Sequence, residues 1–202
     1  EALKNAVVLD IPDQKYEILY LLSEISELKN DDDTREVRLL TILNEDKNFL
    51  DKALVRSMKS TIKADRKDSL EKFFSMYRAD GYYMLSAYNQ LAKFYLEKGE
   101  DEKALEFACL ASITGFTKIV DIVNKRNINF VYEGFSSALY EASLFSDIVE
   151  WGKENNVWGS FNFLAEVAEK NGYYIFAATL LKNLSENSPD EYYRKKAVID
   201  LD

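Results

Sequence analysis

The sequence lacks histidine entirely and has a single cysteine, Cys109, among its 202 residues. Without histidine there is no imidazole to serve as a general base or a metal ligand, and one cysteine cannot form an intrachain disulfide. The chain also lacks Gly-x-Gly-x-x-Gly, phosphate-loop and Gly-x-Ser-x-Gly motifs. We therefore expect a protein that is not an enzyme and that holds no metal or cofactor.

Glycine and proline are scarce, at seven and two residues. This is too little turn chemistry for a β-sandwich or a β-barrel, whose many short strands need frequent turns. Hydrophobic residues make up 47% of the chain and charged residues 30%, so a core can form and disorder is not expected. The composition predicts an all-α fold.

Positive charge is in deficit, because 26 basic residues face 35 acidic ones and leave a net charge of −9. Such a chain is repelled by phosphate backbones and by anionic lipid head groups, so we expect no nucleic-acid partner. No apolar run approaches the roughly 20 residues that a membrane-spanning helix needs. We expect no membrane insertion and a soluble protein, cytoplasmic or exported after removal of a signal peptide that this chain does not contain.

Apolar residues recur at steps of three and four, as Leu54, Met58 and Ile62 do, which is the spacing of one helix face. Two helix starts carry capping signals: Asp33-x-x-Glu36 fits a capping box, and Ser188 precedes a proline and a glutamate before the last helix. The predicted helices, about twelve in number, are 14–29, 33–44, 46–63, 66–79, 82–98, 101–114, 116–126, 129–142, 145–156, 158–171, 174–186 and 190–199.

An internal repeat organises these helices. The pattern of Leu70, Phe73, Phe74, Tyr77 and Gly81 recurs with the same spacing at 104–115, 132–143 and 161–172. One helix of such a hairpin cannot bury its apolar face alone, so the units must stack. We predict a single domain, 1–202, whose parts are an N-terminal capping segment (1–32), five degenerate helix-turn-helix units (33–186) and a C-terminal capping helix (187–202). Within the units, we expect turns at Gly81, Gly115 and Gly172.

Two segments resemble a tetratricopeptide repeat. One runs from Phe161 to Pro189 and the other from Tyr88 to Ala108, with the family's glycine at Gly172 and Gly99. An odd number of predicted helices separates them, so they lie in opposite phase, and we adopt the phase of the later segment because the five-unit repeat shares it. Residues 115–120 have a weaker resemblance to the second helix of an ankyrin repeat.

The tetratricopeptide resemblance implies a right-handed α-solenoid of stacked antiparallel hairpins. It also implies a non-catalytic scaffold that binds a partner protein or peptide. The carboxylate clamp that binds chaperone tails does not carry over, because Ser86 with Gln90, or Gly159 with Phe163, occupies its positions. Two alternatives stay open: a small-ligand or solute-handling accessory of a transport system, and a docking or regulatory domain of a larger protein. The oligomeric state is also open.

Two groups of residues are candidates for partner binding. Basic residues at steps of four, three and four form a stripe along one helix face. This stripe suits an acidic partner, although a solvated helix face explains it as well. Aromatic residues at the margins of the apolar faces suit partner anchoring or packing between hairpins. The basic stripe comprises Lys52, Arg56, Lys59 and Lys63, and the aromatic candidates are Tyr83, Tyr140, Trp151 and Trp158.

Cys109 lies among small residues, next to Ala108 and near Ala111. Nothing in the chain can activate its thiol, since histidine is absent. We expect a buried, inert cysteine that any binding function does not require.

Overall fold

A computed structural model describes residues 12–78 and 84–201, and these residues form twelve helices and no strand. The all-α prediction is confirmed. The helices are α2 (Pro12–Leu28), α3 (Asp32–Leu43), α4 (Lys47–Leu50), α5 (Lys52–Lys63), α6 (Ser69–Phe74), α7 (Leu85–Glu97), α8 (Asp101–Arg126), α9 (Phe135–Ser143), α10 (Ser146–Glu154), α11 (Val157–Lys170), α12 (Tyr174–Asn187) and α13 (Glu191–Leu201).

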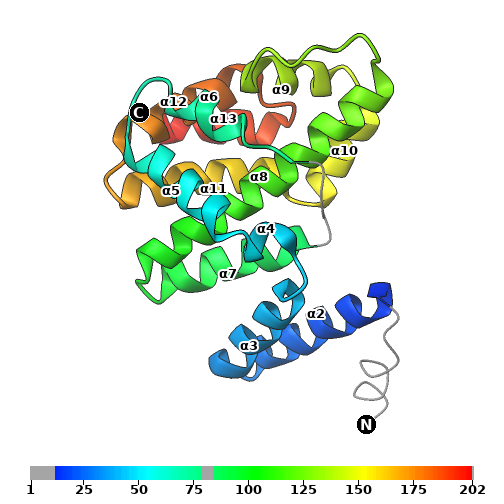
Figure 1. Cartoon of the computed structure of the whole chain (residues 1–202), viewed down its shortest axis with the longest axis vertical. Helices are drawn as coiled ribbons and strands as arrows, with labels where there is room; N and C mark the ends of the chain where they lie inside the picture. The colour runs from blue at the N-terminus through cyan, green and yellow to red at the C-terminus, as the bar shows by residue number, and fades with distance from the viewer. Residues whose placement is uncertain (1–11, 79–83, 202) are drawn as a thin grey trace.

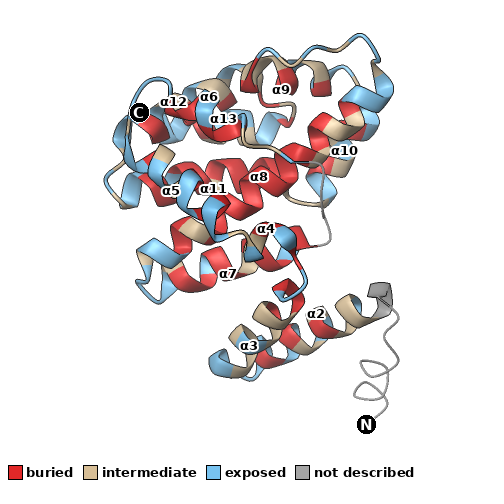
Figure 2. Ribbon diagram, in the orientation of Figure 1, coloured by how far each residue is buried: buried red, intermediate tan, exposed pale blue. Residues whose placement is uncertain are grey.

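The centre of the molecule is the pair α8 and α11, which pack along each other and are buried over most of their length (Figures 1 and 2). Helix α7 packs on α8, and α12 packs on both α11 and α13. The pair α2 and α3 lies at one end of the molecule (Figure 1). It is joined to α7 by two hydrogen bonds, from Tyr95 Oη to Glu36 (2.5 Å) and from the Ala87 amide to Tyr20 Oη (3.1 Å).

Gly115 does not form a turn, so that prediction is wrong. It lies inside α8, a continuous helix of 26 residues that replaces the two predicted helices 101–114 and 116–126. A Cβ atom on Gly115 would lie 2.9 Å from Cγ1 of Val157, at the start of α11. The absence of a side chain at Gly115 therefore allows α8 and α11 to pack closely. The repeat pattern cannot distinguish a glycine needed for close packing from one needed for a turn.

The turn at Gly172 is confirmed, and Gly81 lies outside the described residues. Gly172 has a φ of 85° between α11 and α12, and Gly99 has a φ of 73° between α7 and α8. Both segments that resemble a tetratricopeptide repeat thus contain a helix, a glycine turn and a second helix. Their opposite phases are compatible because the fusion at Gly115 removes one helix between them.

An aromatic cluster joins helices that are far apart in the sequence. The short helix α6 places Phe74 against Phe135 of α9, with ring centroids 3.8 Å apart, and against Phe161 of α11 at 5.6 Å. Its neighbour Phe73 contacts Phe176 of α12 at 5.8 Å. All of these rings are fully buried. Helix α6 is thus a central core element, although the repeat pattern predicts only an ordinary helix of one of the five units.

Both predicted helix caps are displaced by two residues. Asp31, not Asp33, caps α3 by accepting a hydrogen bond from the Thr34 amide at 3.2 Å. Asp190, not Ser188, accepts from the Tyr193 amide at 3.1 Å at the start of α13. An aspartate carboxylate that reaches the amide three residues ahead satisfies an otherwise unpaired donor, and this local geometry decides where each helix begins.

Helix α9 is capped by a residue from a distant segment. Gly134 precedes the helix and has no side chain to cap it, so the Phe135 amide donates to Glu71 Oε2 at 2.9 Å. We expect Glu71→Ala to lower the free energy of unfolding by about 1 kcal/mol, the usual contribution of a helix cap. Urea denaturation measures this, with Glu133→Ala, at an exposed site next to Gly134, as the control. Equal effects of the two substitutions would contradict the capping role.

Candidate functional site

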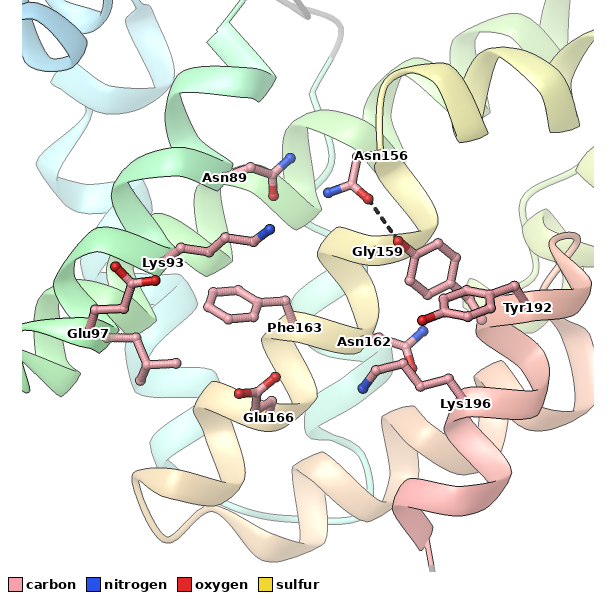
Figure 3. A pocket seen from close by; sticks show the side chains of 12 residues that line it. Asn89, Lys93, Glu97, Asn156, Gly159, Asn162, Phe163, Glu166, Tyr192 and Lys196 are labelled. Carbon is pink, nitrogen blue, oxygen red and sulfur yellow. Dashed lines mark hydrogen bonds between the residues drawn. The ribbon is translucent and has the colours of Figure 1, made fainter. Parts of the chain in front are cut away.

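A groove of about 410 Å³ lies between α7, α11 and α13 (Figure 3). Each helix contributes one face, because the lining residues recur at steps of three or four along it. The groove continues into a second hollow of about 390 Å³, which shares Asn89, Lys93 and Asn156 with it. The polar and aromatic residues that line the main groove include Asn89, Lys93, Glu97, Asn156, Asn162, Phe163, Glu166, Tyr192, Tyr193 and Lys196.

The contact between α11 and α13 shapes one wall. Asn156 precedes α11 in the left-handed conformation, with a φ of 53°, and its Oδ1 accepts a hydrogen bond from Tyr193 Oη at 3.0 Å. A Cβ on Gly159 would lie 2.1 Å from that Oδ1 and 2.6 Å from Tyr193 Oη. The absence of a side chain at Gly159 is therefore what permits this hydrogen bond and keeps this part of the groove open.

A second amide is fixed across the groove. Ser160 Oγ donates to Oδ1 of Asn89 at 2.8 Å, and this bond holds α7 and α11 together inside the protein. The side-chain nitrogen of Asn89 makes no hydrogen bond with the residues that the structure describes. Asn89 therefore offers the groove a donor in a fixed position.

The third amide, Asn162, has an unsatisfied acceptor. The residue is only 2% exposed, and its Oδ1 has no hydrogen-bond partner among the described residues. Its nitrogen makes a long bond of 3.4 Å to the Trp158 carbonyl within α11. A buried acceptor without a partner costs about 1–3 kcal/mol, so its presence in the groove floor requires an explanation.

Charged groups of both signs line the groove. The ammonium of Lys196 is hydrogen-bonded to Asp200 at 2.6 Å, which is the main reason that its pKa is raised, and Glu166 adds to this effect at longer range. The side chains of Lys93, Glu97 and Glu166 form no ion pair or hydrogen bond within the described part of the chain. Figure 3 shows the ring of Phe163 between Lys93 and Glu166.

The structure brings the four residues of the basic stripe together on α5, where they line a separate hollow of about 510 Å³. Two of them form ion pairs with glutamates of α8. Nζ of Lys63 lies 2.6 Å from Oε1 of Glu102, and Nζ of Lys59 lies 3.3 Å from Oε2 of Glu106. Arg56 donates from Nε to the Lys52 carbonyl, and the Lys52 ammonium lies over a phenylalanine ring. Partial neutralisation by α8 supports the solvated-face interpretation, and an acidic partner stays a prediction.

These ion pairs should contribute little to stability. We expect Lys59→Met with Lys63→Met to lower the free energy of unfolding by less than about 1 kcal/mol, with the difference lost near 1 M salt. The hydrogen bond from Lys63 lowers the pKa of Glu102, so this contribution is present above the unfolded pKa and is lost as pH falls through the lowered value. Denaturation at two salt concentrations measures it, with exposed Lys67→Met as control. A salt-independent loss would contradict an electrostatic origin.

The aromatic candidates are dispersed. Trp158 is fully buried and donates from Nε1 to the Val149 carbonyl at 3.2 Å, so its prediction as a surface anchor is wrong. Trp151 is half-buried against the core, and Tyr140 is 61% exposed. Tyr83 lies outside the described residues. Sequence periodicity misplaces Trp158 because it does not show that the ring packs where Gly152 has no side chain. A Cβ on Gly152 would lie 2.3 Å from Cζ2 of that ring.

Cys109 is fully buried, as predicted, and burial raises the pKa of its thiol. A thiol in this state is a poor nucleophile. Among the described residues, no group of three or more Asp, Glu or Cys side chains is placed to hold a metal ion. None of the described helices is both long enough and apolar enough to span a membrane.

The sequence pattern does not predict the groove. In the sequence, Gly159 and Phe163 stand out only as residues that do not match a carboxylate clamp, and Asn89, Asn156 and Asn162 belong to no recognised motif. A partial signal does exist, since Asn162 lies on the same face of α11 as Gly159 and Phe163, and Asn156 immediately precedes that helix. Polar amides at positions facing the apolar core indicate a polar cavity or groove.

No family model matches the chain, and no solved structure matches it. A protein of Treponema pallidum (strain Nichols), described as uncharacterized, is 26% identical to the chain over 197 residues. The matched region is 96% of this chain and 52% of the Treponema protein. The chain thus spans about half the length of the curated relative that it matches.

Proposed function

We propose that this chain is a non-catalytic helical-repeat scaffold that binds an extended segment of a partner protein in the groove between α7, α11 and α13. The observation that carries the proposal is the buried, unpartnered Oδ1 of Asn162 in the groove floor. Folding alone gains nothing from this arrangement, whereas a bound ligand with an N–H donor would satisfy the acceptor.

An extended peptide fits the other features of the groove. A peptide backbone presents alternating N–H and C=O groups, and asparagine amides can both donate to and accept from such a backbone. Asn89 supplies a donor, Asn162 supplies an acceptor, and Phe163 supplies an apolar surface for a side chain. Three helix faces that converge on one groove also give the concave shape that peptide recognition requires.

Asn162→Leu tests this proposal by separating binding from stability. Nonapeptides selected from a random displayed library on the wild-type protein should bind this variant about tenfold more weakly, because one buried hydrogen bond is lost. The free energy of unfolding should stay the same or rise, since leucine removes an unpaired buried acceptor from the free protein.

The matched control is Asn124→Leu, which alters an exposed asparagine near the end of α8. This control should leave peptide affinity unchanged. If the selected peptides bind Asn162→Leu as tightly as the wild type, the groove floor is not the binding site.

A further inference from the structure

The groove presents two free carboxylates and an aromatic face. Glu97 on α7 and Glu166 on α11 have exposed carboxylates that make no ion pair or hydrogen bond with described residues. The ring of Phe163 lies between Lys93 and Glu166 (Figure 3), and Asn162 in the floor adds the buried, unpartnered Oδ1. Carboxylates and an aromatic face are the groups that bind ammonium and guanidinium ions.

The main groove is lined by two glutamates and two lysines, and an excess of acidic residues comes from a neighbouring hollow. A smaller hollow of about 190 Å³ shares Glu166 and Lys196 with the main groove and adds Glu169 and Asp200. The ammonium of Lys196 is already engaged by Asp200. Lys93 is thus the one cation of these two hollows without an ion pair among the described residues. The local balance is negative, as is the net charge of −9 for the whole chain.

We propose that the groove selects a basic peptide segment, whose Arg or Lys side chain lies over Phe163 between Glu97 and Glu166 and whose N–H donates to Asn162 Oδ1. This inference rests on the proposed function and specifies the chemistry of its partner. A cation is attracted by both carboxylates before contact, so charge complementarity increases the association rate as well as the affinity. An acidic segment would meet like charge here.

The experiment uses the same random nonapeptide library, and the selected sequences are examined for Lys and Arg. A fluorescent peptide that represents the selected set is then titrated against charge variants at about 0.05 M and about 1 M salt. We expect Glu97→Gln with Glu166→Gln to weaken binding about tenfold at low salt and far less at high salt. Lys93→Gln should strengthen binding, because it removes a charge of the same sign as the peptide. Glu133→Gln, which lies outside the groove, is the control.

The outcomes separate this inference from the proposed function. Selected peptides that require Asn162 and Phe163 but show no excess of Lys or Arg would overturn the charge selection and leave groove binding intact. The same holds if Glu97→Gln with Glu166→Gln and Lys93→Gln leave affinity unchanged. A library that yields only peptides indifferent to Asn162→Leu and Phe163→Ala would overturn both.

Discussion

Phe74→Ala should lower the free energy of unfolding by about 3–5 kcal/mol, the usual range for truncation of a buried phenylalanine. The ring is fully buried and contacts Phe116, Phe135 and Phe161 from three different helices, so the resulting cavity cannot be closed by one local shift. Because domains are stable by only about 5–15 kcal/mol, much of the total stability depends on this one side chain.

Urea denaturation followed by circular dichroism measures the loss. Tyr140→Ala is the control, because it removes an aromatic ring that is 61% exposed, and its effect should stay within about 0.5 kcal/mol. If both variants lose the same small amount, α6 is not the central core element that its contacts indicate.

The fold class was predictable because it depends on composition and on local periodicity. Scarce glycine and proline and the spacing of residues such as Leu54, Met58 and Ile62 require no tertiary information, and the structure confirms helices at these positions. The turn at Gly172 was predicted from the same periodicity, and the structure confirms it with a positive φ.

Properties that depend on contacts between helices were not predictable. Gly115 and Gly172 occupy equivalent positions in the repeat, yet one packs beside Val157 inside α8 and the other forms a turn. The central position of α6 depends on which aromatic rings meet in space. The groove is another such property, because α7 precedes α11 in the sequence, α13 follows it, and the three helices come together only in the folded protein. No local pattern shows that Asn162 Oδ1 lacks a hydrogen-bond partner.

Gly152→Ala should be among the most damaging single substitutions in the chain, at about 3 kcal/mol. A Cβ at this position would lie 2.3 Å from Cζ2 and 2.4 Å from Cε2 of Trp158, a ring that is buried and hydrogen-bonded to the Val149 carbonyl. Alanine is a better helix former than glycine by about 1 kcal/mol, and Gly152 lies within α10, so propensity alone predicts the opposite sign. The steric overlap is with a rigid ring and outweighs this gain.

Two comparisons identify the cause of the loss. Gly99→Ala places a Cβ in open space at a φ of 73°, so it should cost only the backbone strain of about 1–2 kcal/mol. In the double variant Gly152→Ala with Trp158→Phe, the smaller ring should recover part of the stability, which a double-mutant cycle detects as coupling between the two positions. Additive losses, or a gain in stability for Gly152→Ala alone, would show that the Trp158 ring moves aside and that its position depends on something other than the missing side chain at 152.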